Sequence, residues 1–244
     1  MYFPTTHWSL LAKATLDGEA AGCAALEELC RRYWSPLNHF IRARGYGEAE
    51  AEDLTQEFLV YLMTESALRR PDPTRGRFRS FLLGTLNNFL SHERERRFAQ
   101  KRGGGWAHLS VENMAPSDEA SAVDGNGLVA EFDRVWAQTI VRLALQAVEE
   151  EYTKADKSAL FKILRLFLPG GMAPPSYEEA VARTGVSVAA FTSEVHRLRR
   201  RFRECVYAEV TSTVSAPHET EEEILHLYRV LMDRGTDLRP AQKS

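Results

Sequence analysis

The spacing of apolar residues is the feature that most constrains the fold of this 244-residue chain. In nearly every periodic segment the apolar residues recur three or four positions apart, which places them on one face of an α-helix. No segment alternates apolar and polar residues convincingly, as a half-buried strand does. The sequence therefore predicts an all-α fold, and its 44% hydrophobic and 27% charged residues are ordinary for a globular protein.

The first predicted helices lie in residues 19–43. A stripe of Cys23, Leu26, Cys30 and Tyr33 predicts a helix over residues 19–33. Ser35 as N-cap and Pro36 in the first turn then predict a second helix, which buries Leu37, Phe40 and Ile41. The three cysteines, Cys23, Cys30 and Cys205, form no CxxC pair and are expected to be reduced thiols of the core.

An acidic face is predicted in the segment EAEDLTQEFLVYLM, residues 50–63. Leu54, Phe58 and either Tyr61 or Leu62 would face the core. Three polar residues at helical spacing would then share the exposed face, namely Asp53, Gln56 and Glu57. Such a face is either a solvated helix surface or the docking site of a partner.

A long helix with a basic second half is predicted over residues 77–98. Amide and cationic side chains lie there beside several phenylalanines, an arrangement that also suits single-stranded DNA, because bases stack on aromatic rings while cations follow the backbone. The candidate residues are Asn87, Asn88, Arg94, Arg96, Arg97, Lys101 and Arg102.

The composition changes to Gly, Ser, Ala, Asp and Asn between residues 103 and 127, which predicts a flexible linker. We therefore expect two helical domains, over residues 1–102 and 128–215. Residues 216–244 form a C-terminal extension. Thr220 and Glu223 form a capping-box pattern there, which predicts a helix through Met232. This helix either docks on the second domain or makes a regulatory contact.

A helix-turn-helix is predicted near residues 176–203. Ser176 and Glu179 form a capping box, the first helix ends at Thr184 and Gly185, and Ser187 can cap the second helix. One face of that second helix is apolar, with Val188, Phe191, Val195, Leu198 and Phe202. The opposite face is small and basic, so its backbone can approach a DNA groove while its arginines reach base edges or phosphates. The candidate DNA contacts are Ser187, Ala189, Ser193, His196, Arg197, Arg200 and Arg201.

Several function classes lack support in the sequence. No apolar run is long enough for a membrane span and no signal peptide is visible, so we expect a cytoplasmic protein. The seven histidines include no HExxH pair, and no phosphate-binding loop or nucleophile motif occurs. We expect no catalytic residues, no bound metal and no cofactor.

Three segments, in this order, resemble conserved regions of a known family. AEDLTQEFLVYL, FRSFLLGTLNNFLSHERERR and SYEEAVARTGVSVAAFTSEVHRLRRRFRE are similar to the second and fourth regions of extracytoplasmic-function sigma factors of bacterial RNA polymerase. The opening FPTTHWSLL and the tail look like a longer subgroup of that family, so the resemblance covers roughly residues 3–232. Phe81 and His92 stand where typical members carry Trp and Asp.

The resemblance implies a role for each predicted surface. Asp53, Gln56 and Glu57 would dock on the clamp helices of core RNA polymerase. Residues 87–102 would melt and hold the minus-ten promoter element, and the helix over residues 187–203 would read the minus-thirty-five element as duplex. The implied partners are core RNA polymerase, promoter DNA and, as a candidate regulator, an anti-sigma factor.

Two alternatives remain open at this point. The chain could be a free-standing helix-turn-helix regulator that binds duplex DNA without polymerase, with its N-terminal half serving as a ligand or dimerisation module. It could also be an adaptor with no DNA-binding role.

Overall fold

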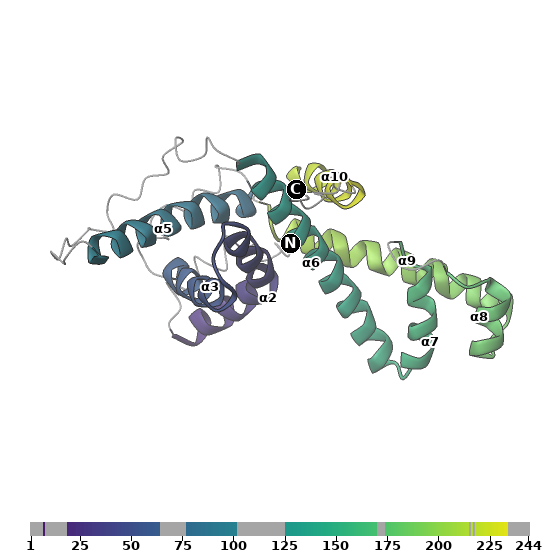
Figure 1. The fold of residues 1–244 in the computed structure, drawn as a ribbon. Helices are drawn as coiled ribbons and strands as arrows, with labels where there is room; N and C mark the ends of the chain where they lie inside the picture. The colour runs from purple at the N-terminus through teal and green to yellow at the C-terminus, as the bar shows by residue number, and fades with distance from the viewer. Residues whose placement is uncertain are drawn as a thin grey trace. The chain divides into compact units, whose positions relative to one another are not determined.

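The computed structural model describes residues 7, 19–63, 77–101, 125–169, 174–214, 216 and 218–233. These residues form eight α-helices and one short 3-10 helix and contain no strand, so the expected all-α class is confirmed for them (Figure 1). In chain order the elements are α2 (Glu19–Ala43), α3 (Glu48–Leu62), α5 (Phe78–Lys101), α6 (Gly125–Lys154), α7 (Ser158–Leu164), η3 (Arg165–Phe167), α8 (Tyr177–Thr184), α9 (Val188–Thr211) and α10 (Glu219–Met232).

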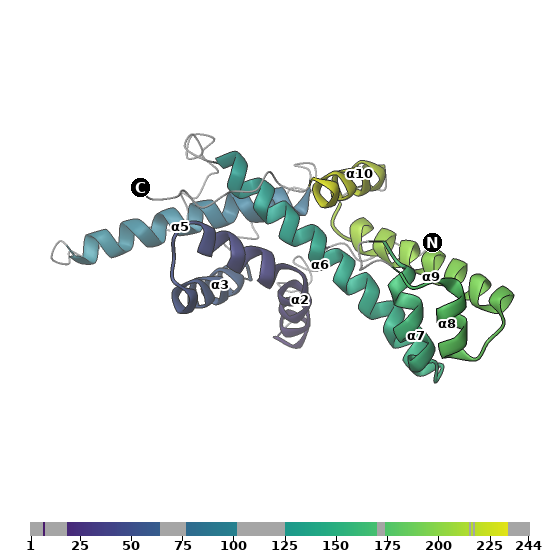
Figure 2. The ribbon, with the colours of Figure 1, turned by 45° about the vertical axis from the view of Figure 1, so that its right-hand side comes forward.

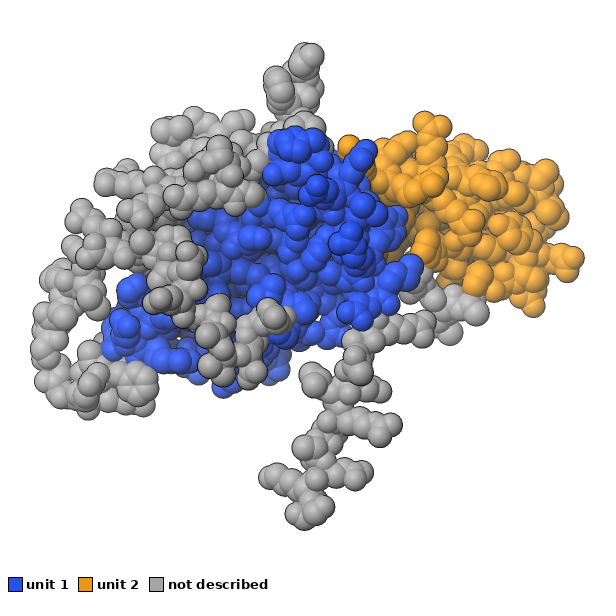
Figure 3. All heavy atoms as spheres, turned by 90° about the horizontal axis from the view of Figure 1, so that it is seen from above, with its two compact units in different colours: residues 1–139, 211–244 blue, residues 140–210 orange. Residues whose placement is uncertain are grey.

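The chain divides into two compact units (Figure 3). Unit 1 contains residues 1–139 and 211–244, and unit 2 contains residues 140–210. This division differs from the predicted domains 1–102 and 128–215, because the first half of α6 and all of α10 belong to the same unit as α2, α3 and α5. Helix α6 also begins at Gly125, inside the predicted linker of residues 103–127.

Helix α2 is a single helix with Pro36 inside it, so the prediction of two helices was wrong. Proline removes one backbone donor and disfavours a helix interior. Tyr33 and Leu37, on either side of Pro36, are both fully buried, and this packing sustains the helix through the proline. The predicted burial of Leu37, Phe40 and Ile41 is confirmed.

The cysteines of α2 do not form the buried stripe that the spacing predicted. Cys23 is exposed and Cys30 is half-buried, whereas Ala25 and Leu29 occupy the core face. The third cysteine, Cys205 in α9, is buried as expected. Tyr33 of the predicted stripe is fully buried, and the buried positions before it lie one residue earlier than expected, which is about a quarter of a helical turn.

Helices α3 and α5 supply further residues of the apolar core of unit 1, to which Phe132 and Trp136 of α6 also belong. The predicted inward positions of α3 are confirmed, since Leu54, Phe58 and Leu62 are buried. The Phe89 ring of α5 packs beside Phe58, with ring centroids 5.6 Å apart. Helix α3 also packs on α2, where Asn38 donates a hydrogen bond to the buried Thr55 hydroxyl at 3.4 Å.

A buried charge cluster joins α5, α6 and α10 in unit 1. Arg79 of α5 donates to Glu223 of α10 at 2.6 Å and to Asp133 of α6 at 2.5 Å. Glu223 also accepts from Arg77 at 2.8 Å, and His226 lies 2.9 Å from Asp133. Burial by itself would lower the pKa of Arg79, because it disfavours the charged form. The hydrogen bonds and charges of Glu223 and Asp133 have the larger effect, so the pKa of Arg79 is raised.

These contacts correct the prediction for the C-terminal extension. Helix α10 ends at Met232 as expected, but Thr220 and Glu223 form no capping box. Glu223 is fully buried against Arg79 of α5 and Arg77, the residue before that helix. Helix α10 begins at Glu219, whose side chain accepts from the backbone N–H of Ala216. The extension therefore packs on α5 as well as on α6.

Unit 2 combines the second half of α6 with α7, η3, α8 and most of α9 (Figure 2). The rings of Phe167, Tyr177 and Phe191 pack edge to face, at centroid distances of 5.1 to 5.8 Å, and hold α8 against α9. Arg199 of α9 caps the end of η3 by donating twice to the carbonyl of Phe167, at 2.9 and 3.1 Å. Unit 2 thus presents α8 and α9 on a shared aromatic core.

Candidate protein and nucleic-acid interfaces

The acidic face of α3 is exposed as predicted. Asp53, Gln56 and Glu57 are all exposed, on the side of the helix opposite its buried stripe. Within the described residues, their side chains make no hydrogen bond and no ion pair. No described residue therefore occupies the polar groups of this face.

The second half of α5 carries the candidate single-strand contacts. Asn87 and Asn88 are half-buried, and Arg94, Arg96 and Arg97 are exposed. The side chain of Lys101 and the whole of Arg102 lie outside the described residues.

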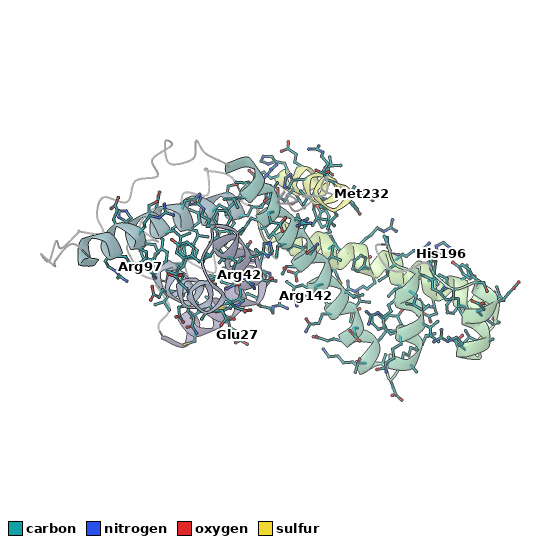
Figure 4. All side chains as sticks on the ribbon, in the orientation of Figure 1. Glu27, Arg42, Arg97, Arg142, His196 and Met232 are labelled. Atoms are coloured by element: carbon teal, nitrogen blue, oxygen red, sulfur yellow. The ribbon has the colours of Figure 1, made fainter. Side chains whose placement is uncertain are left out.

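The three arginines in the second half of α5 differ in their partners. Arg97, which Figure 4 labels, donates a hydrogen bond to Glu50 of α3, and this bond raises the pKa of Arg97. Arg96 pairs with Glu93 in the preceding turn at 2.7 Å. Arg94 makes no ion pair within the described part of the chain, so it is the arginine most available for a phosphate.

Arg44 is a candidate contact that sequence reasoning missed. It follows α2 and lies over the Phe40 ring, 5.0 Å from its centroid. Its guanidinium donates to the side-chain oxygen of Asn87 at 2.6 Å. Burial, and after it the nearby charge of Arg94, lower the pKa of Arg44. No pattern in the sequence links Arg44 to residues some forty positions later, so only the fold could reveal this contact.

The segment predicted to be a helix-turn-helix has the caps and the glycine turn that the sequence predicted. Ser176 and Glu179 form the reciprocal capping box, with Glu179 N–H donating to Ser176 Oγ at 3.1 Å. Gly185 ends α8 with φ of +70°, a conformation that glycine adopts at little cost. Ser187 Oγ then accepts from the N–H of Ala190 at 3.3 Å and caps α9. Each of these signals acts within one helical turn, which is why the sequence predicted them.

The outward face of α9 matches the predicted set. Phe191, Val195 and Leu198 are fully buried. The candidate DNA contacts Ser187, Ala189, Ser193, His196, Arg197, Arg200 and Arg201 are all exposed (Figure 4 labels His196). Val188, the first residue of α9, was expected to be buried and is 52% exposed.

The arginines of α9 are partly engaged in ion pairs. Arg197 and Arg200 pair with Glu194 and Glu204 of the same helix, yet 66% and 78% of their side-chain surfaces remain exposed. Arg201 donates to Glu151 of α6 at 2.6 Å and to Glu204 at 3.1 Å, and these hydrogen bonds raise its pKa. Arg201 therefore holds α9 to α6 within unit 2, while Arg197 and Arg200 are more available to a ligand.

The structure groups the candidate residues by unit. Asp53, Gln56, Glu57 and the α5 residues belong to unit 1, and the α9 residues belong to unit 2. Among the described residues, no cluster of three or more His, Cys, Asp or Glu side chains could hold a metal ion. No helix in the described ranges is long and apolar enough to cross a membrane.

Comparison with known proteins gave no match: no protein-family model, no curated protein and no solved structure resembles the chain significantly. The function of the chain therefore has to be inferred from its own residues.

Proposed function

We propose that the chain is a sigma factor that binds core RNA polymerase and directs promoter recognition and opening. In this role α3 docks on polymerase, the polar face of α5 holds the melted minus-ten element, and α9 reads the minus-thirty-five element as duplex. The chain acts in the cytoplasm and performs no chemistry itself, because RNA synthesis belongs to polymerase.

The observation that carries the proposal is the exposed face of Asp53, Gln56 and Glu57 on α3. All three side chains lack partners in the described chain, and Leu54, Phe58 and Leu62 behind them are buried. A basic partner surface would pair with these groups without disturbing the core. The exposed small and basic face of α9 supports the DNA-binding part of the role.

Run-off transcription tests the proposal. Core RNA polymerase from the source organism is incubated with genomic promoter fragments, with and without the purified chain. We expect specific transcripts only when the chain is present. Their absence, or an identical set of transcripts without the chain, contradicts the proposal.

A free-standing helix-turn-helix regulator is the second candidate, favoured by unit 2, which presents α8 and α9 on a core of its own. Without polymerase, nothing fixes the separation of the two small basic surfaces. The effective concentration of the second surface at its DNA site is then low, and so is the overall affinity for DNA. We therefore expect the isolated chain to bind promoter fragments weakly in gel-shift assays at physiological salt. Tight, sequence-specific binding by the chain without polymerase would favour the regulator.

A further inference from the structure

The amide of Asn87 has one hydrogen-bonding group already occupied. Its oxygen accepts from the guanidinium of Arg44 at 2.6 Å, within unit 1. An arginine side chain has donors and no acceptor, so the oxygen of the amide must be the group that faces it. The amide nitrogen, with its two N–H donors, therefore points away from Arg44.

Arg44 is itself held in place. Its backbone N–H donates to the carbonyls of Phe40 and Ile41, at 3.2 and 3.1 Å, which fixes the chain at the end of α2. Its guanidinium lies 5.0 Å from the centroid of the Phe40 ring, a cation–π contact. Because Phe40 is buried, this contact keeps the guanidinium against the core and aimed at α5.

The donor side of Asn87 is available to a ligand. Asn87 is half-buried, and no group in the described part of the chain accepts a hydrogen bond from its amide nitrogen. Asn87, Ser91 and Arg94 are spaced four and three residues apart and share one face of α5. Arg94 on this face is exposed and unpaired among the described residues, so a phosphate can bind there while a base meets the amide.

We propose that Arg44 is a positioning residue that presents Asn87 as a hydrogen-bond donor to an acceptor atom on an unpaired base of the melted promoter strand. This inference rests on the proposed function. A donor placed opposite the exocyclic group of a base favours the keto oxygens of thymine and guanine over the amino groups of adenine and cytosine. The pair thus sets base preference at one position of the minus-ten element.

The test is transcription by the holoenzyme from a promoter library in which each minus-ten position is randomised, followed by sequencing of the transcripts. Asn87→Asp keeps an oxygen for Arg44 and replaces the N–H donors by a second acceptor. We expect it to lower the preference at one position by about three- to tenfold, the contribution of a hydrogen bond. Ser80→Asp adds the same charge at an exposed position of α5 outside the candidate DNA contacts and should leave the preference at that position within about twofold.

Variants of Arg44 distinguish a role in orienting the Asn87 amide from a role in the stability of the fold. Arg44→Met keeps a long side chain over Phe40 but has no donor, so the amide of Asn87 is free to rotate and the preference at the same position should fall. Arg44→Lys keeps a donor and should retain most of the preference. Circular dichroism melts of each variant report its stability.

Two results overturn the inference. One is an unchanged base preference in Asn87→Asp, and the other is a loss in Arg44→Met that is equal at all promoter positions. If the wild-type chain supports no specific transcription, the proposed function fails first and the inference fails with it. Specific transcription by the wild type, with uniform effects of the variants, removes the inference and leaves the proposed function standing.

Discussion

Leu198 and Arg200 lie two residues apart in α9 and have opposite surroundings. Leu198 is fully buried in the aromatic core of unit 2, whereas 78% of the Arg200 side chain is exposed. A two-residue step rotates a helix by more than half a turn, so neighbours in sequence can serve packing and binding separately.

Substitution of these two residues should separate stability from promoter choice. Leu198→Ala leaves a cavity and should lower the free energy of unfolding by about 2–5 kcal/mol without changing relative promoter preference. Arg200→Ala should change that free energy by less than about 0.5 kcal/mol, since it removes an exposed group. If Arg200 contacts a base, preference at one upstream position should relax by about 1–3 kcal/mol.

Urea unfolding and transcription from promoters with altered upstream elements check both expectations. Equal losses of stability in the two variants, with unchanged promoter choice, would show that the faces of α9 have been assigned wrongly.

At the scale of the element, α3 separates a buried stripe from an exposed acidic face. The double variant Gln56→Ala with Glu57→Lys should abolish binding to core polymerase, because a reversed charge repels a basic partner surface. The fold should be retained, since exposed substitutions change stability by about 0.5 kcal/mol or less.

A pull-down with core polymerase and a circular dichroism melt measure the two properties of this double variant. Glu221→Lys reverses a charge on an exposed residue of α10 and serves as the matched control. Normal binding by the α3 double variant, together with a normal melt, removes the docking assignment.

Helix α10 is attached to the rest of unit 1 through ion pairs of a buried glutamate. Glu223 is fully buried between Arg77 and Arg79. Breaking a buried ion pair costs up to about 3–5 kcal/mol, and Arg79 keeps a second carboxylate partner in Asp133. We therefore expect Glu223→Gln to lower the free energy of unfolding by less than about 3 kcal/mol and to raise amide exchange throughout α10.

Hydrogen exchange followed by mass spectrometry resolves this effect by segment. Glu221→Gln, two residues away and exposed, should leave exchange in α10 unchanged. Equal exchange in both variants would mean that the apolar contacts of α10, such as the buried Leu227, suffice to hold it.

At the scale of the whole molecule, unit 1 is assembled from distant parts of the chain. His7 is buried, and its ring nitrogens lie 3.0 Å from the Tyr33 hydroxyl and 3.2 Å from the Ser212 hydroxyl. The backbone N–H groups of His7 and Phe78 donate to the carbonyls of Ser212 and Thr213. The segment that follows α9 is therefore fixed to residues near the start of the chain.

The burial of His7 predicts a dependence of stability on pH. Burial, and then the charges of Arg32 and Arg31, lower the pKa of His7 below its ordinary value of 6.5. The unfolded chain then binds a proton at a higher pH than the folded chain does. The contribution of His7 to stability is fully present above about pH 6.5 and is lost as the pH falls from there toward the folded-state pKa.

Urea unfolding at pH 7.5 and pH 5.5 measures this loss. The free energy of unfolding should differ less between pH 7.5 and pH 5.5 in His7→Gln than in the wild type. His196→Gln, at an exposed site, should behave like the wild type. An equal difference in His7→Gln would show that other groups cause the loss.

The sequence by itself determined the features that depend on one or two helical turns. The all-α class, the buried stripe of α3 and the end of α10 at Met232 were all predicted from spacing. The capping box at Ser176 and the left-handed Gly185 were predicted as well, because the groups that satisfy them lie within four residues.

The tertiary structure decided the features whose partners lie far along the chain. Ser176 with Glu179 and Thr220 with Glu223 are the same capping pattern, yet only the first forms a capping box. Glu223 instead meets Arg79, which precedes it by 144 residues, and Asn87 meets Arg44 across 43 residues. A buried carboxylate such as Glu223 needs a cationic partner because an unpaired buried charge is costly, and such distant partners come together only when the chain has folded.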